Sequence, residues 1–197
     1  MTRFDVLDNL VENGNGYLCT SQVVGAGVSK PTLAEYVYQR KMERVAQGIY
    51  LAEDAWPDEL YILSLSNSRI VFSHETALML HGLMEREPKI TSVTVMAGYN
   101  ASHLRRKGIR VYQVKPDIYN LGIVEVKTLF GNTVRAYNME RTVCDILRYK
   151  DEMDVQVFQY AMKEFMGSTH KNLNYLMAYA KQLHVDTSVR TYTEVML

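Results

Sequence analysis

The sequence has little cysteine and no long apolar run. Its two cysteines, Cys19 and Cys144, stand far apart and form no C-x-x-C pair. This spacing favours neither a disulfide framework nor a zinc site, so we expect buried, reduced thiols. No stretch approaches the roughly 18 apolar residues of a membrane span, and the first residues lack the apolar core of a signal peptide. The sequence therefore predicts a cytoplasmic protein with no membrane contact.

The sequence also lacks several motifs of phosphate-binding and hydrolytic enzymes. It has no G-x-x-x-x-G-K-[ST] loop, no G-x-S-x-G elbow and no G-x-G-x-x-G turn. Gly167-Ser168 is similar to the Gly-Ser of nucleotidyltransferases, but no D-x-D follows it. We therefore expect no enzymatic activity, no cofactor and no bound metal.

The net charge is zero, which argues against a chain that is basic throughout. Positive charge is nevertheless concentrated in residues 98–150, which carry ten basic and four acidic side chains. This stretch is either a surface for acidic protein or nucleic acid, or an ordinary solvated loop and strand face. Its candidate residues are Arg105, Arg106, Lys107, Arg110, Lys115 and Lys127.

The first fifty residues show a pattern of three helices followed by a hairpin. Helix-start residues precede apolar residues at helical spacing, and glycines end the first two helices. The starts are Thr2, Thr20 and Ser29, and the glycine-rich ends are 14–16 and 25–27. Two β-like segments around Ala46-Gln47-Gly48 follow. Residues 1–52 are therefore predicted to form a winged helix-turn-helix, with a protein-interaction module as the alternative.

Basic residues of this segment cluster in the third helix and the hairpin, where a DNA-binding module docks on the duplex. The expected DNA contacts are Lys30, Thr32, Gln39, Arg40, Lys41, Arg44 and Gln47. Thr32 and Gln39 could reach base edges, whereas Lys30, Arg40 and Arg44 would hold phosphates.

Residues 56–197 are predicted to form a second, larger domain. Helical patterns at 54–67 and after Ser73 come first, residues 91–137 then alternate with period two as half-buried strands do, and the remainder shows helical spacing. The expected strands are 91–96, 109–114, 123–129 and 133–137, and the expected helices are 139–149, 154–166 and 172–184. This order predicts an α+β domain with a small, mostly antiparallel sheet and helices.

Three phrases of the chain resemble the AbiEi antitoxins. Residues 43–50 (ERVAQGIY) are similar to the family's wing, and residues 73–83 (SHETALMLHGL) are similar to a second family phrase. Residues 140–145 (ERTVCD) resemble the family's Glu-Arg-Thr-x-x-Asp helix start. The phrases occur in the family's order. Asn138-Met139 stands where many relatives have Ser-Pro, but Asn is an equally good helix cap.

AbiEi proteins are the antitoxin half of a type IV bicistronic toxin–antitoxin system associated with phage abortive infection. The resemblance implies a winged helix-turn-helix that represses its own operon by binding inverted repeats in the promoter. It also implies a C-terminal domain that counters a nucleotidyltransferase-like toxin of the AbiEii type without a stable complex. The expected function is therefore that of a repressor and antitoxin. The sequence leaves open the operator, the oligomeric state and the mode of toxin neutralisation.

Two other functions are weighed against this one. Pro116-Asp117 and Glu125-Val126-Lys127 spell the PD…ExK pattern of metal-dependent nucleases, which place two carboxylates on a divalent ion. We favour a chance match, because Glu125 and Lys127 alternate with valines as on the wet face of a strand. The other alternative is a transcription factor that senses a small molecule.

His74 and His81 are a candidate metal pair, since they lie two helical turns apart with Glu75 beside the first. The i,i+4 spacing of zinc-binding helices is absent, however. We therefore expect His74 and Glu75 to lie in the first turn of a helix. His81 is expected to be a hydrogen-bonded, partly buried residue.

Overall fold

The structure, a computed structural model, describes the backbone of residues 2–196 and the side chains of residues 2–194. The chain divides into two compact units. Unit 1 contains Met1–Ser68 and Thr128–Asn132, and unit 2 contains Arg69–Lys127 and Thr133–Leu197. The boundary expected near residues 52–56 thus differs from the division seen in the structure, because the helix that follows it packs on the sheet of unit 1.

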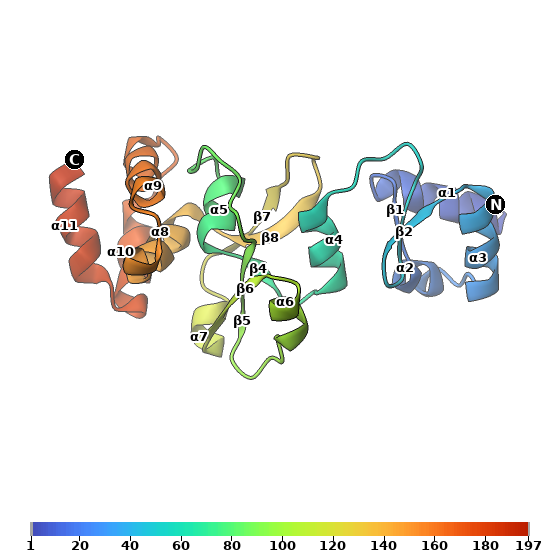
Figure 1. The fold of residues 1–197 in the computed structure, drawn as a ribbon, viewed down its shortest axis with the longest axis horizontal. Helices are drawn as coiled ribbons and strands as arrows, with labels where there is room; N and C mark the ends of the chain where they lie inside the picture. Colours follow the sequence, from blue (N-terminus) through green and yellow to red (C-terminus); the bar gives the residue numbers. More distant parts are fainter. Residues whose placement is uncertain (1, 197) are drawn as a thin grey trace. The chain divides into compact units, whose positions relative to one another are not determined.

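Unit 1 combines helices with a small antiparallel sheet (Figure 1). Its elements are α1 (Arg3–Asn13), β1 (Tyr17–Cys19), α2 (Thr20–Gly25), α3 (Lys30–Gln39), β2 (Glu43–Ala46), β3 (Ile49–Leu51) and α4 (Glu59–Ser66). β3 lies between β1 and β2 and is antiparallel to both. The predicted capping box at Thr2 and the predicted cap at Ser29 are confirmed.

The sheet of unit 1 is apolar on both faces. Leu18 belongs to the core that α1, α2 and α3 build, around Leu7, Val23 and Leu33. Its neighbours in β1, Tyr17 and Cys19, belong to a second cluster with Ile49, Leu51 and the α4 side chains Tyr61, Ile62 and Leu65. Successive residues of a strand point to opposite faces, so β1 alone contributes to both cores. α4 is the element that the sequence-based boundary left out of this unit.

Asp58 connects three segments of unit 1. Its buried carboxylate accepts hydrogen bonds from Thr128 Oγ1 at 2.6 Å and Asn132 Nδ2 at 2.8 Å, and it caps α4 through Tyr61 N at 3.1 Å. The backbone N–H of Asp58 donates to the Tyr17 hydroxyl at 2.7 Å. The two hydrogen bonds from Thr128 and Asn132 explain why residues 128–132 belong to unit 1.

Unit 2 is built from a five-stranded sheet and a group of helices (Figure 1). Its first elements are β4 (Val71–Phe72), α5 (His74–Leu80), β5 (Ser92–Met96), α6 (Ser102–Arg106), β6 (Arg110–Val114), α7 (Pro116–Tyr119), β7 (Ile123–Lys127) and β8 (Thr133–Tyr137). They are followed by α8 (Met139–Arg148), η1 (Lys150–Glu152), α9 (Val155–Gly167), α10 (Leu173–Leu183) and α11 (Asp186–Met196).

The expected α+β class is confirmed, but the sheet is mixed, not mostly antiparallel. Its strand order is β6-β5-β4-β8-β7, in which β5–β6 and β4–β8 are parallel pairs. A parallel pair needs a crossover connection. The stretch between β5 and β6 supplies one through α6, a short helix that the strand periodicity did not reveal. The pairs β4–β5 and β7–β8 are antiparallel.

The main core of unit 2 lies among α5, α8, α9, α10 and α11. Its buried members include Leu78, Val143, Ile146, Met162, Phe165, Leu176, Leu183 and Val189. Cys144 lies in this core and Cys19 lies in unit 1, both as free thiols, as predicted. Among the described residues, none of the helices has the length and apolar character needed to cross a membrane.

α8 buries polar side chains as well as apolar ones. Asn138 caps it, and every side chain from Glu140 to Leu147 is buried. Arg141 Nε lies 3.1 Å from both carboxylate oxygens of Asp145, and its guanidinium lies over the Tyr137 ring at 4.2 Å. Burial raises the pKa of Asp145 to about 6, and the attraction of Arg141 opposes that rise. This helix start is therefore held by an internal ion pair.

Candidate nucleic-acid interface

α3 is a ten-residue helix with well-defined ends. The Ser29 hydroxyl accepts from Thr32 N at 3.3 Å, and Pro31 stands in the first turn, where its missing N–H has no helical partner to lose. The helix ends at Arg40, and Lys41 then adopts a φ of +50°, which turns the chain toward the hairpin.

One side of α3 is buried and the opposite side faces solvent. Leu33 and Tyr36 pack into the core of unit 1. At 100° per residue, Ala34 and Tyr38 lie on the opposite side, and both are exposed. The Tyr38 side chain is 85% exposed, an unusual position for a large aromatic residue in the middle of a helix. The outer face of α3 is therefore available to a partner.

The hairpin formed by β2 and β3 follows α3 directly. Gly48 lies in its turn with a φ of +71°, and a Cβ there would lie 3.2 Å from the Thr20 hydroxyl, so the turn favours glycine. Arg44 is exposed on β2, next to an irregularity in the pairing with β3. Gln47 is exposed in the turn. The hairpin thus presents one cationic and one amide side chain to solvent.

Three of the expected contact residues are occupied within unit 1. Arg40 Nη2 pairs with Asp8 at 2.8 Å, so its guanidinium faces α1. Gln39 Nε2 donates to Glu35 at 3.0 Å, and the Thr32 hydroxyl lies 2.8 Å from that of Ser29. These groups would have to exchange an internal hydrogen bond for one to DNA.

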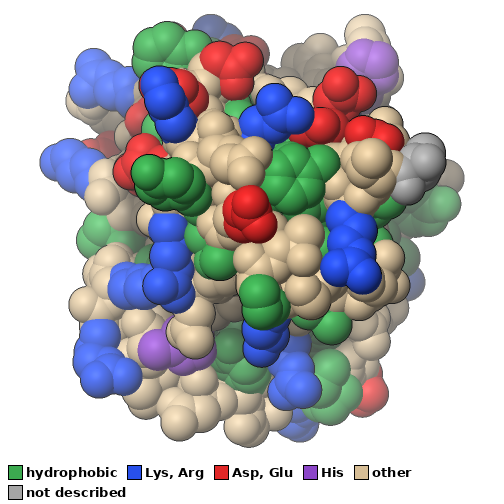
Figure 2. All heavy atoms as spheres, turned by 90° about the vertical axis from the view of Figure 1, so that its right-hand side faces the viewer, with side chains coloured by type: hydrophobic (Ala, Val, Ile, Leu, Met, Phe, Trp, Pro, Cys, Tyr) green, Lys and Arg blue, Asp and Glu red, His purple; other side chains and the backbone are tan. Residues whose placement is uncertain are grey.

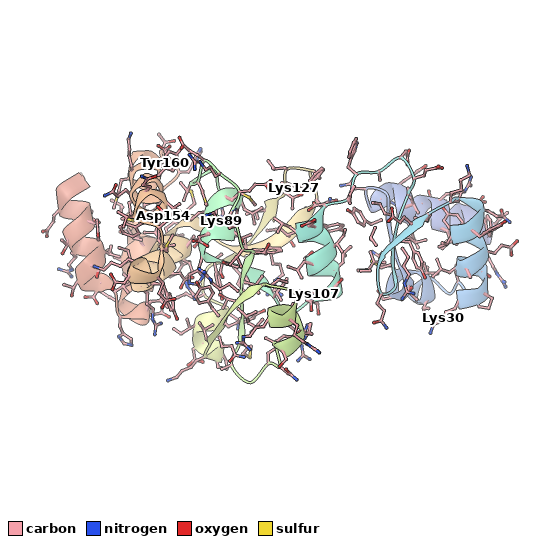
Figure 3. The ribbon with its side chains drawn as sticks, in the orientation of Figure 1. Lys30, Lys89, Lys107, Lys127, Asp154 and Tyr160 are labelled. Carbon is pink, nitrogen blue, oxygen red and sulfur yellow. The ribbon has the colours of Figure 1, made fainter. Side chains whose placement is uncertain are left out.

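The other expected contact residues are exposed and form no ion pair with any described residue. They are Lys30, Lys41, Arg44 and Gln47. Lys30 lies at the start of α3 (Figure 3). Figure 2 shows a face of the molecule on which Lys and Arg side chains lie among acidic and apolar ones. The first fifty residues carry equal numbers of acids and bases, so the cations available to a partner are the few that no internal acid pairs.

Sequence reasoning did not include Tyr38 among the contact residues. Helical periodicity alone places Tyr38 on the outer face of α3. Its near-complete exposure could be seen only from how the three helices pack in the structure. Val24 in α2, 50% exposed, is a second apolar side chain on the surface of this helical segment. These exposed apolar side chains were not among the predicted contacts, because only polar residue types were considered.

The six basic residues of the second half do not form one edge of the sheet. Residues 105–107 belong to α6 and its C-terminal cap, which pack beside the edge strand β6. Arg110 begins β6 and lies 3.7 Å from Glu75, and Lys115 follows the far end of that strand. Lys127 ends β7, the opposite edge strand, and Figure 3 shows it apart from Lys107. A local group at residues 105–110 is the largest continuous part of the expected surface.

The residues weighed for metal chemistry are not clustered. No group of three or more His, Cys, Asp or Glu side chains with metal-binding geometry occurs among the described residues. Glu125 and Lys127 are exposed on β7. His74 and Glu75 open α5, and His81 Nε2 lies 2.7 Å from the carbonyl oxygen of Tyr137. The predicted first-turn position of His74 and the predicted hydrogen bond of His81 are confirmed.

The comparisons with known proteins concern the fold. No protein-family model matches the sequence, and no curated protein matches it. The structure is similar to the crystal structure of the RV2827C protein from Mycobacterium tuberculosis, with a TM-score of 0.55 and 12% sequence identity. The match covers 89% of this chain and 70% of that chain. At this identity the likeness shows a shared fold only.

Proposed function

We propose that unit 1 is a winged helix-turn-helix that binds double-stranded DNA through the outer face of α3 and the β2–β3 hairpin. The observation that carries this proposal is the exposed outer face of α3 beside exposed, unpaired cationic groups. A major groove admits one α-helix, and α3 is short, capped and followed at once by a hairpin. Lys30, Lys41 and Arg44 would contact phosphates, while Gln47 and Tyr38 would reach sugars or base edges.

The small number of free cations bears on how the protein would bind its operator. Phosphate neutralisation supplies most non-specific affinity, so one copy of unit 1 would bind weakly. Two copies on an inverted repeat would combine their affinities, as in other helix-turn-helix dimers. We therefore propose that the protein acts in the cytoplasm as a repressor of its own promoter.

The same proposal assigns unit 2 a non-enzymatic antitoxin role against a nucleotidyltransferase-like toxin, without a stable complex. Its support is the resemblance of three phrases to the AbiEi antitoxins. Two of these phrases form α5 and the start of α8, which pack on each other in the core of unit 2. They therefore carry the fold of the unit, and the surface that acts on a toxin would lie elsewhere. Residues 105–110 are the basic surface offered by this unit.

DNA binding is tested with the full-length protein and a labelled duplex from upstream of its reading frame. Arg44→Ala should weaken binding about 10-fold and reduce the slope of log affinity against log salt by about 1. Arg40→Ala is the matched control, because Arg40 is paired with Asp8 and should leave the affinity within about twofold. Fluorescence anisotropy at three salt concentrations measures both. No binding to any promoter duplex, or equal losses in the two variants, would reject the interface.

The antitoxin role is tested separately by co-expression with a nucleotidyltransferase-like protein from the adjacent reading frame. Rescue of growth by the full-length protein is expected. Arg105→Glu combined with Arg106→Glu should reduce rescue while promoter binding stays unchanged, if residues 105–110 act on the toxin. Failure of the unaltered protein to rescue growth would remove the antitoxin role and leave DNA binding untouched.

A further inference from the structure

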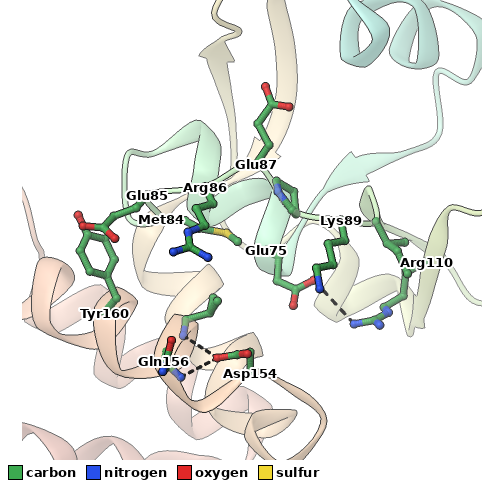
Figure 4. Close-up of a pocket in the computed structure, with 13 residues that line it drawn as sticks. Glu75, Met84, Glu85, Arg86, Glu87, Lys89, Arg110, Asp154, Gln156 and Tyr160 are labelled. Atoms are coloured by element: carbon green, nitrogen blue, oxygen red, sulfur yellow. Dashed lines mark hydrogen bonds and ion pairs between the residues drawn. The ribbon is translucent and has the colours of Figure 1, made fainter.

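Unit 2 contains a cavity of about 360 Å³, which shares only Arg110 with the surfaces proposed for DNA binding and toxin neutralisation. It is lined by residues of four elements (Figure 4). These are α5, the loop between α5 and β5, the start of β6 and the first turns of α9. The volume lies at the lower end of the range typical for small-molecule sites, about 300–1,000 Å³. Four separate elements thus converge on a space large enough for one small ligand.

Three cationic side chains line this cavity: Arg86, Lys89 and Arg110. Arg86 and Lys89 are exposed and form no ion pair with a described residue. Arg110 lies 3.7 Å from Glu75, which is longer than a hydrogen bond, and its side chain is 39% exposed. Several N–H donors of the three residues are therefore free for an anionic group.

The acidic side chains of the lining are arranged differently. The Asp154 carboxylate caps α9 by accepting from the backbone N–H groups of Gln156 at 2.8 Å and Val157 at 3.3 Å. Figure 4 shows Glu87 directed away from the cavity and Glu85 directed toward Tyr160. Glu75 faces Arg110, so four acids and three cations share the lining, and the acids provide acceptors for a donor-bearing ligand.

The residue before Glu75 is buried and has a strained backbone. His74, which directly precedes Glu75, has a φ of +49° and is 3% exposed. Its ring stacks on Tyr112 with 3.5 Å between ring centroids, and its Nε2 has no hydrogen-bond partner among the described residues. Strained positions of this kind persist where the surrounding structure fixes them, and they cluster at ligand clamps. Glu75 follows this fixed residue and lies 3.7 Å from Arg110.

We infer that this cavity binds a small phosphorylated compound with sugar hydroxyls, of the size of a nucleoside monophosphate or sugar phosphate. The free donors of Arg86 and Lys89, with Arg110 beside them, can hydrogen-bond phosphate oxygens, and guanidinium forks suit those oxygens. Carboxylates beside them can accept hydrogen bonds from sugar hydroxyls, as acidic residues do for ribose in nucleotide-binding folds. Ile90, Val157 and Tyr160 supply apolar surface for a ring.

Isothermal titration calorimetry of the full-length protein tests this inference with defined probes. The probes are the four ribonucleoside 5′-monophosphates and ribose 5-phosphate, with adenosine and inorganic phosphate for comparison. At least one phosphorylated probe should bind with a Kd below about 1 mM. Adenosine and inorganic phosphate should each bind at least 10-fold more weakly. Adenosine lacks the phosphate group, and inorganic phosphate lacks the sugar hydroxyls.

The double variant Arg86→Ala, Lys89→Ala should weaken binding of the same probe at least 10-fold. Both residues are exposed in a loop, so the fold is retained, and circular dichroism checks this. Lys163→Ala is the matched control, since Lys163 is an exposed cation of α9 outside the cavity and should leave the Kd unchanged. The inference is overturned if no phosphorylated probe binds, if inorganic phosphate binds equally well, or if the double variant and the control behave alike.

Discussion

Arg40 in unit 1 and Arg141 in unit 2 each pair with a carboxylate, but in different surroundings. The Arg40–Asp8 pair lies at the surface, with side chains 52% and 37% exposed. The Arg141–Asp145 pair is 0% and 5% exposed, and Arg141 also donates to the carbonyl oxygens of Ile118 and Leu121. The same kind of pair is therefore a local surface contact in one unit and part of the core in the other.

This difference extends to the polar residues of the two units. Unit 2 buries a histidine, a glutamate and an ion pair, whereas unit 1 exposes the polar side chains of α3 and the hairpin. Buried side chains such as Glu140 and Asp145, which form their hydrogen bonds within the unit, specify the fold, and exposed, unpaired ones remain free to bind. The residues of the α5 and α8 phrases in unit 2 are thus mainly structural. The exposed polar residues of α3 and the hairpin in unit 1 are the better candidates for contacting a partner.

The largest expected effect on stability comes from the buried pair. Arg141→Ala leaves the Asp145 carboxylate without its partner and should lower the free energy of unfolding by about 3–5 kcal/mol. Arg40→Ala should lower it far less, because its pair is exposed to solvent. Urea unfolding followed by circular dichroism measures both. Equal losses would show that burial does not separate the two pairs.

A second contrast between the units is their response to acid. All five histidines of the chain lie in unit 2. Burial, together with the nearby charges of Arg141 and Arg110, lowers the pKa of His74 from 6.5 to about 3. The folded state therefore binds the proton more weakly than the unfolded state. This contribution to stability is fully present above pH 6.5 and is lost as the pH falls from 6.5 toward 3.

His74→Asn removes this titration, and asparagine tolerates the left-handed backbone of residue 74. Between pH 6.5 and pH 4.5, the unaltered protein should lose roughly 2–3 kcal/mol more unfolding free energy than the variant. Hydrogen exchange followed by mass spectrometry locates the loss, which is expected in unit 2. Parallel pH profiles of the two proteins would contradict the role of His74.

Unit 1 has its own buried carboxylate, which supports a smaller prediction. Asp58→Asn converts an acceptor of three hydrogen bonds into an amide that has fewer lone pairs for them. The free energy of unfolding should fall by about 1–3 kcal/mol. Hydrogen exchange should increase first in residues 128–132, because Thr128 and Asn132 lose their common partner. Asp54→Asn, at an exposed carboxylate of the same unit, should have no such effect.

Local patterns predicted most of the secondary structure. Caps at Thr2, Ser29 and Asn138 and the period-two runs of unit 2 gave the helices and strands within a few residues. Two kinds of information were missing. The mixed sheet depends on the pairing of β4 with β8, far apart in the chain, and no local pattern encodes it. The position of residues 128–132 in unit 1 depends on hydrogen bonds to Asp58, which hairpin chemistry does not reveal.

The candidate site was predicted less completely than the fold. Residue type suggested Arg40 as a phosphate contact, but a carboxylate from α1 reaches it in the folded chain. The exposure of Tyr38 and the cavity beside Arg110 both arise from packing between elements. Charge and hydrogen-bonding capacity can be read from a sequence, whereas the availability of those groups is decided only when neighbouring helices and strands meet.

Tyr38→Ala gives the smallest expected change in stability, and it distinguishes a binding residue from a structural one. Its side chain is 85% exposed, so the free energy of unfolding should change by less than about 0.5 kcal/mol. If α3 lies in a groove, promoter binding should nevertheless weaken by roughly 5- to 10-fold, because a buried aromatic contact is lost at the interface. Tyr38→Phe should keep most of the affinity if the ring, and not the hydroxyl, makes the contact. Unchanged affinity in Tyr38→Ala would move the interface away from the outer face of α3, and the exposed ring would then need another explanation.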